Sequence, residues 1–261
     1  MIQFGIPTLI ETKSLEDCAS LCKELGLNFI ELNMNLPQYQ LENIDIGRFA
    51  EIAQQNRIYY TIHLDENLNV CDFNKKVAAA YLETALQTIE IAKGLEIPVI
   101  NMHMSAGVYF TMPNEKIYLY NEYTDKYLDS LKDFRDKCEK AIGDFNIKIC
   151  IENTNGYNME FLQQGLELLL KSNVFALTFD IGHNAGIGGI DEAVIMRRAN
   201  KLYHMHIHDA LGKKDHLALG TGELDLPKYF YMASKHNCRV VLETKTIEGL
   251  RQSVEWVKNR V

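Results

Sequence analysis

The sequence predicts an α/β fold, a single (β/α)8 TIM barrel, and three observations lead to it. Short β-branched or apolar runs alternate eight times with longer amphipathic runs, as in a parallel sheet joined by helical crossovers. The chain has 261 residues, a usual size for one such barrel. No Ser/Gly-rich, charged or low-complexity tract marks a domain boundary, so we expect residues 1–261 to form one domain.

The predicted strands and helices alternate along the whole chain. Apolar, β-rich runs predict strands at 2–8, 29–34, 58–65, 99–105, 147–153, 175–182, 202–209 and 239–246. Amphipathic patterns predict helices at 14–26, 46–56, 74–96, 123–145, 159–172, 191–201, 226–237 and 247–261. Ser14 and Asp17 have capping-box spacing at the first helix, with Asp in place of Glu or Gln. An open doubly wound sheet is the alternative, but no Gly-x-Gly-x-x-Gly follows the first strand.

The composition restricts the compartment and the partners. The N-terminus lacks the basic and apolar regions of a signal peptide, and no run approaches the roughly 18 apolar residues of a membrane span. We therefore expect a cytoplasmic protein with no membrane partner. Its six cysteines contain no Cys-x-x-Cys pair, which favours reduced thiols. The formal net charge of −8 weakly disfavours a large surface for nucleic acid.

Histidines and acids gather where the predicted strands end. In chain order these residues are His63, Asp65, His103, Glu152, Asp180, His183, His206, His216 and Glu243. A TIM barrel carries its active site at the carboxyl ends of its strands. One such residue alone would be an ordinary hydrogen-bonded side chain. Six successive strands with such a group at the same end instead predict a metal site, because imidazole and carboxylate suit zinc, manganese, iron or cobalt.

The strand at 202–209 carries three histidines at alternate positions. His204, His206 and His208 therefore point to one face, which we take to be the barrel interior. We expect His206 to bind metal and His204 to be a packed barrel residue. We expect His208 to support the site or contact substrate rather than bind metal.

The motifs ICIENTNG, LTFDIGHNAG, MHIHDA, HLALGTGELD and VVLET resemble the xylose isomerase-like TIM-barrel superfamily. That superfamily includes sugar and sugar-phosphate isomerases and epimerases as well as endonuclease IV. The resemblance implies that Glu152, Asp180, His206 and Glu243 hold one divalent ion. It also implies that the two glutamates act as acid and base on either side of a substrate carbon, with His183 contacting the substrate.

The resemblance to endonuclease IV implies further zinc ligands. In that branch His63 and His103 join Glu152 around one ion, and His183 and His216 hold another with an aspartate two residues before the second histidine. Two departures oppose this branch. Position 214 is Lys, with Asp next to it at position 215. Residues 32–43 also lack the Arg-rich loop that would probe DNA.

The function that we expect is a divalent-metal-dependent isomerase or epimerase of a small sugar or sugar phosphate, with one to three Zn or Mn ions per chain. The ion would stabilise the enediolate that forms when a carbon-bound proton leaves, and the catalytic residues Glu152 and Glu243 would move that proton. The candidate substrate-binding residues are His183, His208, Asn67 and Asn153.

Three other functions stay open. The main alternative is a zinc-dependent phosphodiester hydrolase of the endonuclease IV type, an AP endonuclease of DNA repair with nucleic acid as its partner. A dehydratase would use the same single-metal chemistry, and a non-catalytic barrel is opposed by the intact acids and histidines. The Gly-rich loops at 186–191 and 220–222 are either phosphate cradles or plain turns.

Overall fold

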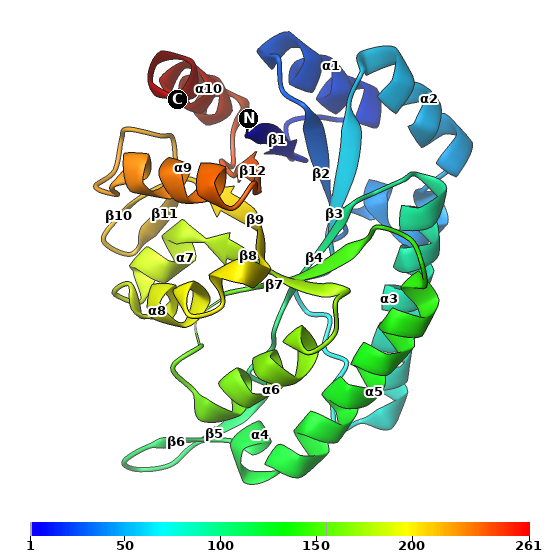
Figure 1. The fold of residues 1–261 in the computed structure, drawn as a ribbon, viewed down its shortest axis with the longest axis vertical. Helices are drawn as coiled ribbons and strands as arrows, with labels where there is room; N and C mark the ends of the chain where they lie inside the picture. The colour runs from blue at the N-terminus through cyan, green and yellow to red at the C-terminus, as the bar shows by residue number, and fades with distance from the viewer. Residues whose placement is uncertain (1, 155) are drawn as a thin grey trace.

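The computed structural model describes residues 2–154 and 156–261, and a closed barrel of parallel strands lies at its centre (Figure 1). Neighbouring strands in the barrel follow one another in the order of the sequence. In the reverse direction, starting from β1, the closed order is β1-β12-β9-β8-β7-β4-β3-β2. They are β1 (Gln3–Pro7), β2 (Phe29–Asn33), β3 (Tyr59–His63), β4 (Val99–His103), β7 (Lys148–Glu152), β8 (Phe175–Asp180), β9 (Leu202–Ile207) and β12 (Arg239–Leu242). The predicted (β/α)8 fold is confirmed.

Amphipathic helices pack around the outside of the barrel (Figure 1). The longer ones are α1 (Leu15–Leu25), α2 (Ile46–Asn56), α3 (Lys75–Gly94), α5 (Thr124–Ile142), α6 (Glu160–Leu170), α9 (Leu226–Lys235) and α10 (Ile247–Arg260). The predicted cap begins α1, because Ser14 Oγ accepts a hydrogen bond from the amide of Asp17 at 3.1 Å. The same helix ends at Gly26, whose φ of 74° is a left-handed conformation that favours glycine.

Several short elements at the carboxyl end of the barrel differ from the prediction. The predicted strand 175–182 ends at Asp180, because that carboxylate accepts a hydrogen bond from the amide of His183 and starts helix α7 (Ile181–Gly186). The region predicted as helix 191–201 forms α8 (Ile190–Met196) and the 3-10 turn η3 (Ala199–Lys201). The others are η1 (Pro37–Tyr39), η2 (Leu41–Asn43), α4 (Leu119–Glu122) and the hairpins β5 (Tyr109–Thr111)–β6 (Lys116–Tyr118) and β10 (Asp209–Leu211)–β11 (Lys214–Leu217).

The interior of the barrel contains buried polar side chains as well as apolar ones. Thr61, Asn101, Thr178 and His204 are fully buried, and Thr178 Oγ1 donates to Asn101 Oδ1 at 2.6 Å. These groups lie beneath the strand ends that carry the predicted site. All six cysteines are free and buried. In the described part of the chain, no helix is both long enough and apolar enough to cross a membrane.

Candidate metal centre

The four side chains predicted to share one ion converge around the Nδ1 atom of His206. This atom lies 3.0 Å from Glu243 Oε2, 3.5 Å from Glu152 Oε2 and 3.8 Å from Asp180 Oδ2. Glu152 and Asp180 end β7 and β8, His206 lies near the end of β9, and Glu243 follows β12. These four strands are neighbours in the barrel, so the sheet itself brings the four side chains together.

The donor atoms of this group fit a divalent cation. His206 Nδ1 and Glu243 Oε2 are buried and have no hydrogen-bond partner among the described residues, which is costly for polar atoms. A cation between them would satisfy both. Ligand atoms about 2.1 Å from one zinc ion, at tetrahedral or octahedral angles, lie about 3.0 to 3.4 Å apart, close to the spacing found here. Carboxylates and one imidazole are ligands that suit zinc or manganese.

His63 and His103 add two imidazoles on another side of Glu152. The Nε2 atoms of these histidines lie 3.3 and 3.5 Å from Glu152 Oε2, and they end β3 and β4. The same oxygen accepts a hydrogen bond from Asn101 Nδ2 at 2.5 Å. Each histidine of this predicted set therefore lies near Glu152 Oε2, to which Asn101 also donates. Among the described residues, however, His63, His103 and Glu152 do not form a common group with ligand spacing.

The predicted set around His183 and His216 is divided. His183 Nδ1 lies 3.2 Å from Glu152 Oε1, and its side chain is 21% exposed. His216 Nε2 lies 3.4 Å from Glu243 Oε1, while its Nδ1 lies 2.9 Å from Asp215 Oδ1. Each histidine thus contacts a different carboxylate of the centre. Among the described residues, His183, His216 and Asp215 do not form a common group with ligand spacing.

His208 is fully buried and supports Asp180. Its Nε2 lies 3.1 Å from Asp180 Oδ2, and its Nδ1 accepts a hydrogen bond from the amide of His216 at 2.8 Å. A Cβ atom on Gly182 would lie only 1.9 Å from the Cε1 atom of this ring, so glycine is required there. Because both ring nitrogens face protein groups, the geometry favours the supporting role over the expected substrate contact.

The two asparagines predicted to bind substrate occupy different environments. Asn153 is fully buried, and its side-chain amide donates to Asp180 O at 2.9 Å and accepts from Asp180 N at 2.8 Å. It therefore fixes the backbone of Asp180, which disfavours the predicted substrate contact. Asn67 is exposed on the loop after β3. Its neighbour Glu66 lines two cavities at this end of the barrel.

Burial and neighbouring charge shift the pKa values of this centre in opposite directions. Burial raises the pKa of Glu152, but His206, His103 and His183 together outweigh it and hold that pKa well below its usual range. Burial lowers the pKa of His63, but the hydrogen bond and charge of Glu152, with the charge of Glu31, raise it to about 9. Asp180, Glu152 and Glu243 together likewise overcome burial and raise the pKa of His183 to about 10. Without a metal, protonated imidazoles therefore balance the carboxylates at neutral pH.

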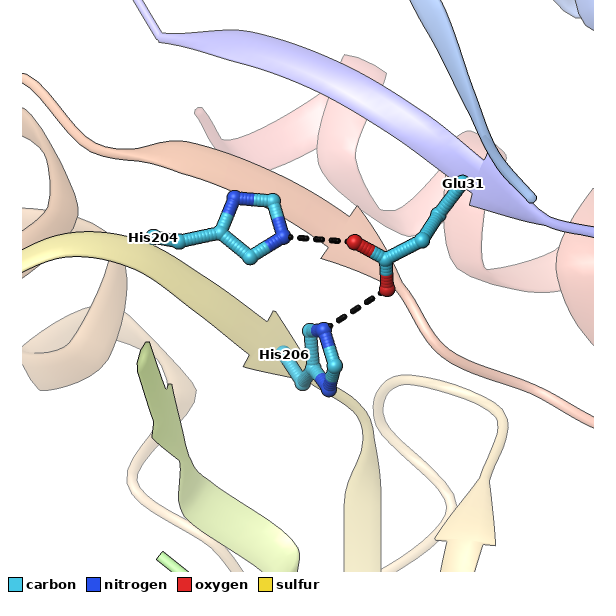
Figure 2. A group of neighbouring side chains, drawn as sticks. All are labelled: Glu31, His204 and His206. Atoms are coloured by element: carbon cyan, nitrogen blue, oxygen red, sulfur yellow. Dashed lines mark hydrogen bonds and ion pairs between the residues drawn. The ribbon is translucent and has the colours of Figure 1, made fainter. Parts of the chain in front are cut away.

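Glu31 is the main residue of this region that the sequence analysis missed. It lies in the middle of β2 and is 3% exposed. Figure 2 shows its two carboxylate oxygens turned toward His204 and His206, whose Nε2 atoms lie 2.9 and 2.8 Å away. His204, predicted to be a packed barrel residue, therefore also has a polar partner. The signal in the sequence was a single acid within an apolar strand, FIELN.

Both Gly-rich loops use their backbone amides within the protein. The amides of Gly220 and Gly222 each donate to Asp209 Oδ2 at 2.9 Å. The amides of Gly188 and Gly189 donate to carbonyl oxygens of helix α7. A phosphate cradle would need these amides, so the structure contradicts that interpretation and agrees with plain turns.

Two cavities of about 310 Å³ each open beside the centre. Glu243 and Lys245 line one cavity, His103 and Tyr109 line the other, and Glu66 lines both. A larger hollow, of about 710 Å³, lies between α3 and α5 and contains none of these groups. The cavities at the carboxyl end are each large enough for a small polar molecule.

The sequence model of the family described as "Xylose isomerase-like TIM barrel" matches residues 19–260. This chain belongs to that family. The match covers every residue of the centre that comes from β2 to β12.

Several relatives share this family's barrel. The uncharacterized protein MJ1188 of Methanocaldococcus jannaschii is 24% identical over 239 residues, which cover 88% of this chain and 83% of that protein. A D-tagatose 3-epimerase-like protein superposes with a TM-score of 0.80 at 22% identity, covering 99% and 97% of the two chains. The IOLI protein, solved with a bound zinc atom, superposes with a TM-score of 0.75 at 16% identity, covering 99% and 96%. At these identities the likeness shows a shared fold.

Proposed function

We propose that this protein is a divalent-metal-dependent isomerase or epimerase of a small sugar or sugar phosphate. One observation carries the proposal: His206 Nδ1 and Glu243 Oε2 are buried and lack hydrogen-bond partners among the described residues, and His206 Nδ1 also faces Glu152 and Asp180. Family membership and the D-tagatose 3-epimerase-like structural relative support the same chemistry. We propose these four side chains as the ligands of one ion.

A bound divalent ion would stabilise the negative charge that develops on the substrate oxygens when a neighbouring C–H bond is broken. The protein's part is to move the proton. Glu152 ends β7, and Glu243 directly follows β12. Two strands, β8 and β9, lie between β7 and β12 in the barrel. The two glutamates therefore approach the space above His206 from two sides, so that one carboxylate removes the proton and the other returns it.

Other side chains are suited to hold the substrate. His183 is partly exposed beside Glu152, and Glu66 lines both cavities. Lys245 Nζ lies 3.1 Å from Glu243 Oε1 and is 62% exposed, so it can turn toward a phosphate or a hydroxyl. We assign the positioning of substrate hydroxyls to His183 and Glu66.

The first test is the metal content of protein purified without added ions. We expect about one zinc or manganese ion per chain, lost in Glu152→Ala and retained in His63→Ala. Thr88→Val is the matched control, because Thr88 is fully buried and its hydroxyl bonds to Thr84 O in helix α3. A wild-type protein that binds no ion even after reconstitution would contradict the proposal.

The second test is proton exchange with ketoses and their phosphates. The loaded enzyme in D2O is expected to place deuterium on one substrate carbon, and Glu243→Gln is expected to stop the exchange. A loaded wild-type enzyme that leaves every ketose and ketose phosphate unlabelled would argue against the reaction class.

A phosphodiester hydrolase is the second candidate, and the position of His63 and His103 favours it. Both Nε2 atoms lie within 3.5 Å of Glu152 Oε2, so a small shift of these side chains would let a second ion share this carboxylate. Clustered ions would activate a water molecule for hydrolysis. Two or three zinc ions per chain, one of them lost in His63→Ala, would favour this function and make abasic DNA the first substrate to test.

A further inference from the structure

Glu31 connects the candidate metal centre with the interior of the barrel. It lies on β2, whereas His204 and His206 lie on β9, and β1 and β12 separate these strands. The contacts in Figure 2 therefore cross the barrel. They join residues 173 positions apart in the chain, at a place where every participant is buried.

The two oxygens of Glu31 have different partners. Oε2 accepts hydrogen bonds from Thr61 Oγ1 at 3.0 Å and is 2.9 Å from His204 Nε2. Oε1 lies 2.8 Å from His206 Nε2. This oxygen is not in the direction of the N–H bond, so the contact is an ion pair rather than an aligned hydrogen bond. Thr61 and His204 thus fix one oxygen and leave the other for His206.

With a cation on the Nδ1 side of His206, the contact with Glu31 favours Nε2 as the ring nitrogen that carries the proton. A lone pair on Nε2 would repel the carboxylate oxygen at 2.8 Å, whereas an N–H group would be attracted to it. With the proton on Nε2, the lone pair of the neutral ring lies on Nδ1. Nδ1 is the atom that faces Glu243, Glu152 and Asp180. A metal ion binds only through such a lone pair.

We propose that Glu31 is a positioning residue for the metal centre, which keeps the ring proton of His206 on Nε2 and turns Nδ1 toward the other ligands. The inference rests on the proposed function in that it assumes an ion at Nδ1. The negative charge of Glu31 also makes the Nδ1 lone pair a stronger ligand for a metal ion, as carboxylates that hydrogen-bond to metal-binding histidines do. Thr61 and His204 act one step further away, by holding Glu31.

Metal affinity tests this role without measuring activity. Titration calorimetry of the metal-free protein with Zn²⁺ or Mn²⁺ compares wild type with Glu31→Gln, which keeps the volume but removes the charge. We expect affinity to fall about 10- to 100-fold, with the number of ions per chain unchanged. Substitution of Co²⁺ gives a second readout, because its visible absorption changes when a ligand is reoriented.

A matched pair of threonines separates positioning from simple structural damage. Thr61 and Thr88 are both fully buried, and Thr→Val keeps their shape, but only Thr61 bonds to Glu31. We expect Thr61→Val to weaken metal binding about threefold to tenfold and Thr88→Val to leave it within about twofold. This pair still decides the question if Glu31→Gln does not fold.

Three results would overturn the inference. Equal affinities in wild type, Glu31→Gln and Thr61→Val would overturn it while leaving the proposed function intact. A fall from two ions to one in Glu31→Gln, with the remaining affinity unchanged, would instead make Glu31, His204 and His206 a cation site of their own. A wild-type protein that binds no ion would overturn both this inference and the proposed function.

Discussion

Two layers of carboxylate and imidazole lie within the barrel, and they differ in how their carboxylate oxygens are paired. The outer layer consists of Glu152, Asp180 and Glu243, which lie 3.0 to 3.8 Å from His206 Nδ1. The inner layer consists of Glu31, Thr61 and His204, whose polar atoms lie 2.9 to 3.0 Å apart. His206 places one ring nitrogen in each layer.

This difference suggests that the outer layer binds the ligand and that the inner layer supports it. In the outer layer Glu243 Oε2 lacks a hydrogen-bond partner among the described residues. In the inner layer Glu31 Oε2 bonds to Thr61 and His204, while the ring atoms His204 Nδ1 and His206 Nε2 lack a partner. Incomplete pairing raises the free energy of the empty centre and favours a ligand that completes it. Substitutions in the outer layer should therefore affect activity more than stability, and those in the inner layer should affect both.

The largest effect is expected from Glu243→Gln in the outer layer. The amide cannot accept a proton, so kcat should fall about 10²- to 10⁴-fold, while the metal-free protein should lose some thermal stability because the carboxylate charge that pairs with His206 and His216 is removed. Steady-state kinetics and thermal unfolding measure the two quantities. A variant with nearly full activity would remove Glu243 from the reaction.

A smaller effect is expected from Gly182→Ala, which disturbs the support of Asp180. The new Cβ would lie 1.9 Å from the His208 ring, so the ring must move away from Asp180, at a cost of about 1 to 3 kcal/mol in the free energy of unfolding. Metal affinity should fall as well. Gly186→Ala in the same helix is the control, because its Cβ would meet nothing within 4 Å. Equal Tm values in the two variants would contradict this account.

The stability of the metal-free protein should depend on pH through His63 and His183, which contact Glu152 of the outer layer. The pKa of His63 is raised to about 9 and that of His183 to about 10, both above the ordinary value of 6.5. Their protonation stabilises the fold below about pH 6.5, and this stabilisation is lost as the pH rises through 9 to 10. Tm should fall by on the order of 5 °C from pH 7 to pH 10.

A bound ion should change this pH dependence. Protons compete with the metal for these side chains, so the increase in Tm that the ion produces should grow from pH 6 to pH 9. Thermal unfolding with and without EDTA measures this increase. An increase that shrinks with pH would mean that the histidines and carboxylates do not bind the ion.

The smallest effect on stability is expected from Lys245→Met at the edge of the outer layer. The exposed pair with Glu243 should contribute no more than about 1 kcal/mol to the free energy of unfolding. If the substrate carries a phosphate, KM for that substrate should rise, while KM for a neutral ketose should change little. Equal changes in the two KM values would exclude Lys245 as a phosphate contact.

The order of strands and helices could be predicted from the sequence because it depends on local hydrophobic periods. The positions of the proposed outer ligands could be predicted too, since Glu152 and Asp180 end their strands as expected and Glu243 directly follows β12. The hairpins β5–β6 and β10–β11 could not, because they are short pairs of strands without a clear hydrophobic alternation.

The inner layer could not be predicted because it depends on closure of the barrel. Glu31 lies within an apolar strand, and its partners lie more than 170 positions further along the chain. Only the closed order of strands brings β2 opposite β9. Asn101, which lies in the middle of β4 and donates a hydrogen bond to Glu152, could not be predicted for the same reason. An isolated polar residue in a predicted barrel strand is the signal that would have found both.

The carboxylate of Asp209 has a consequence for how the selectivity proposed for this protein could be redesigned. It accepts hydrogen bonds from the amides of Ala210, Gly220, Gly222 and Leu224, so these bonds hold the segment after β11 in one conformation. The β5–β6 hairpin after β4 is exposed along much of its length. Libraries that vary Tyr109 and Tyr118 should therefore change which molecules are accepted, while changes around Asp209 should mainly reduce the yield of folded protein.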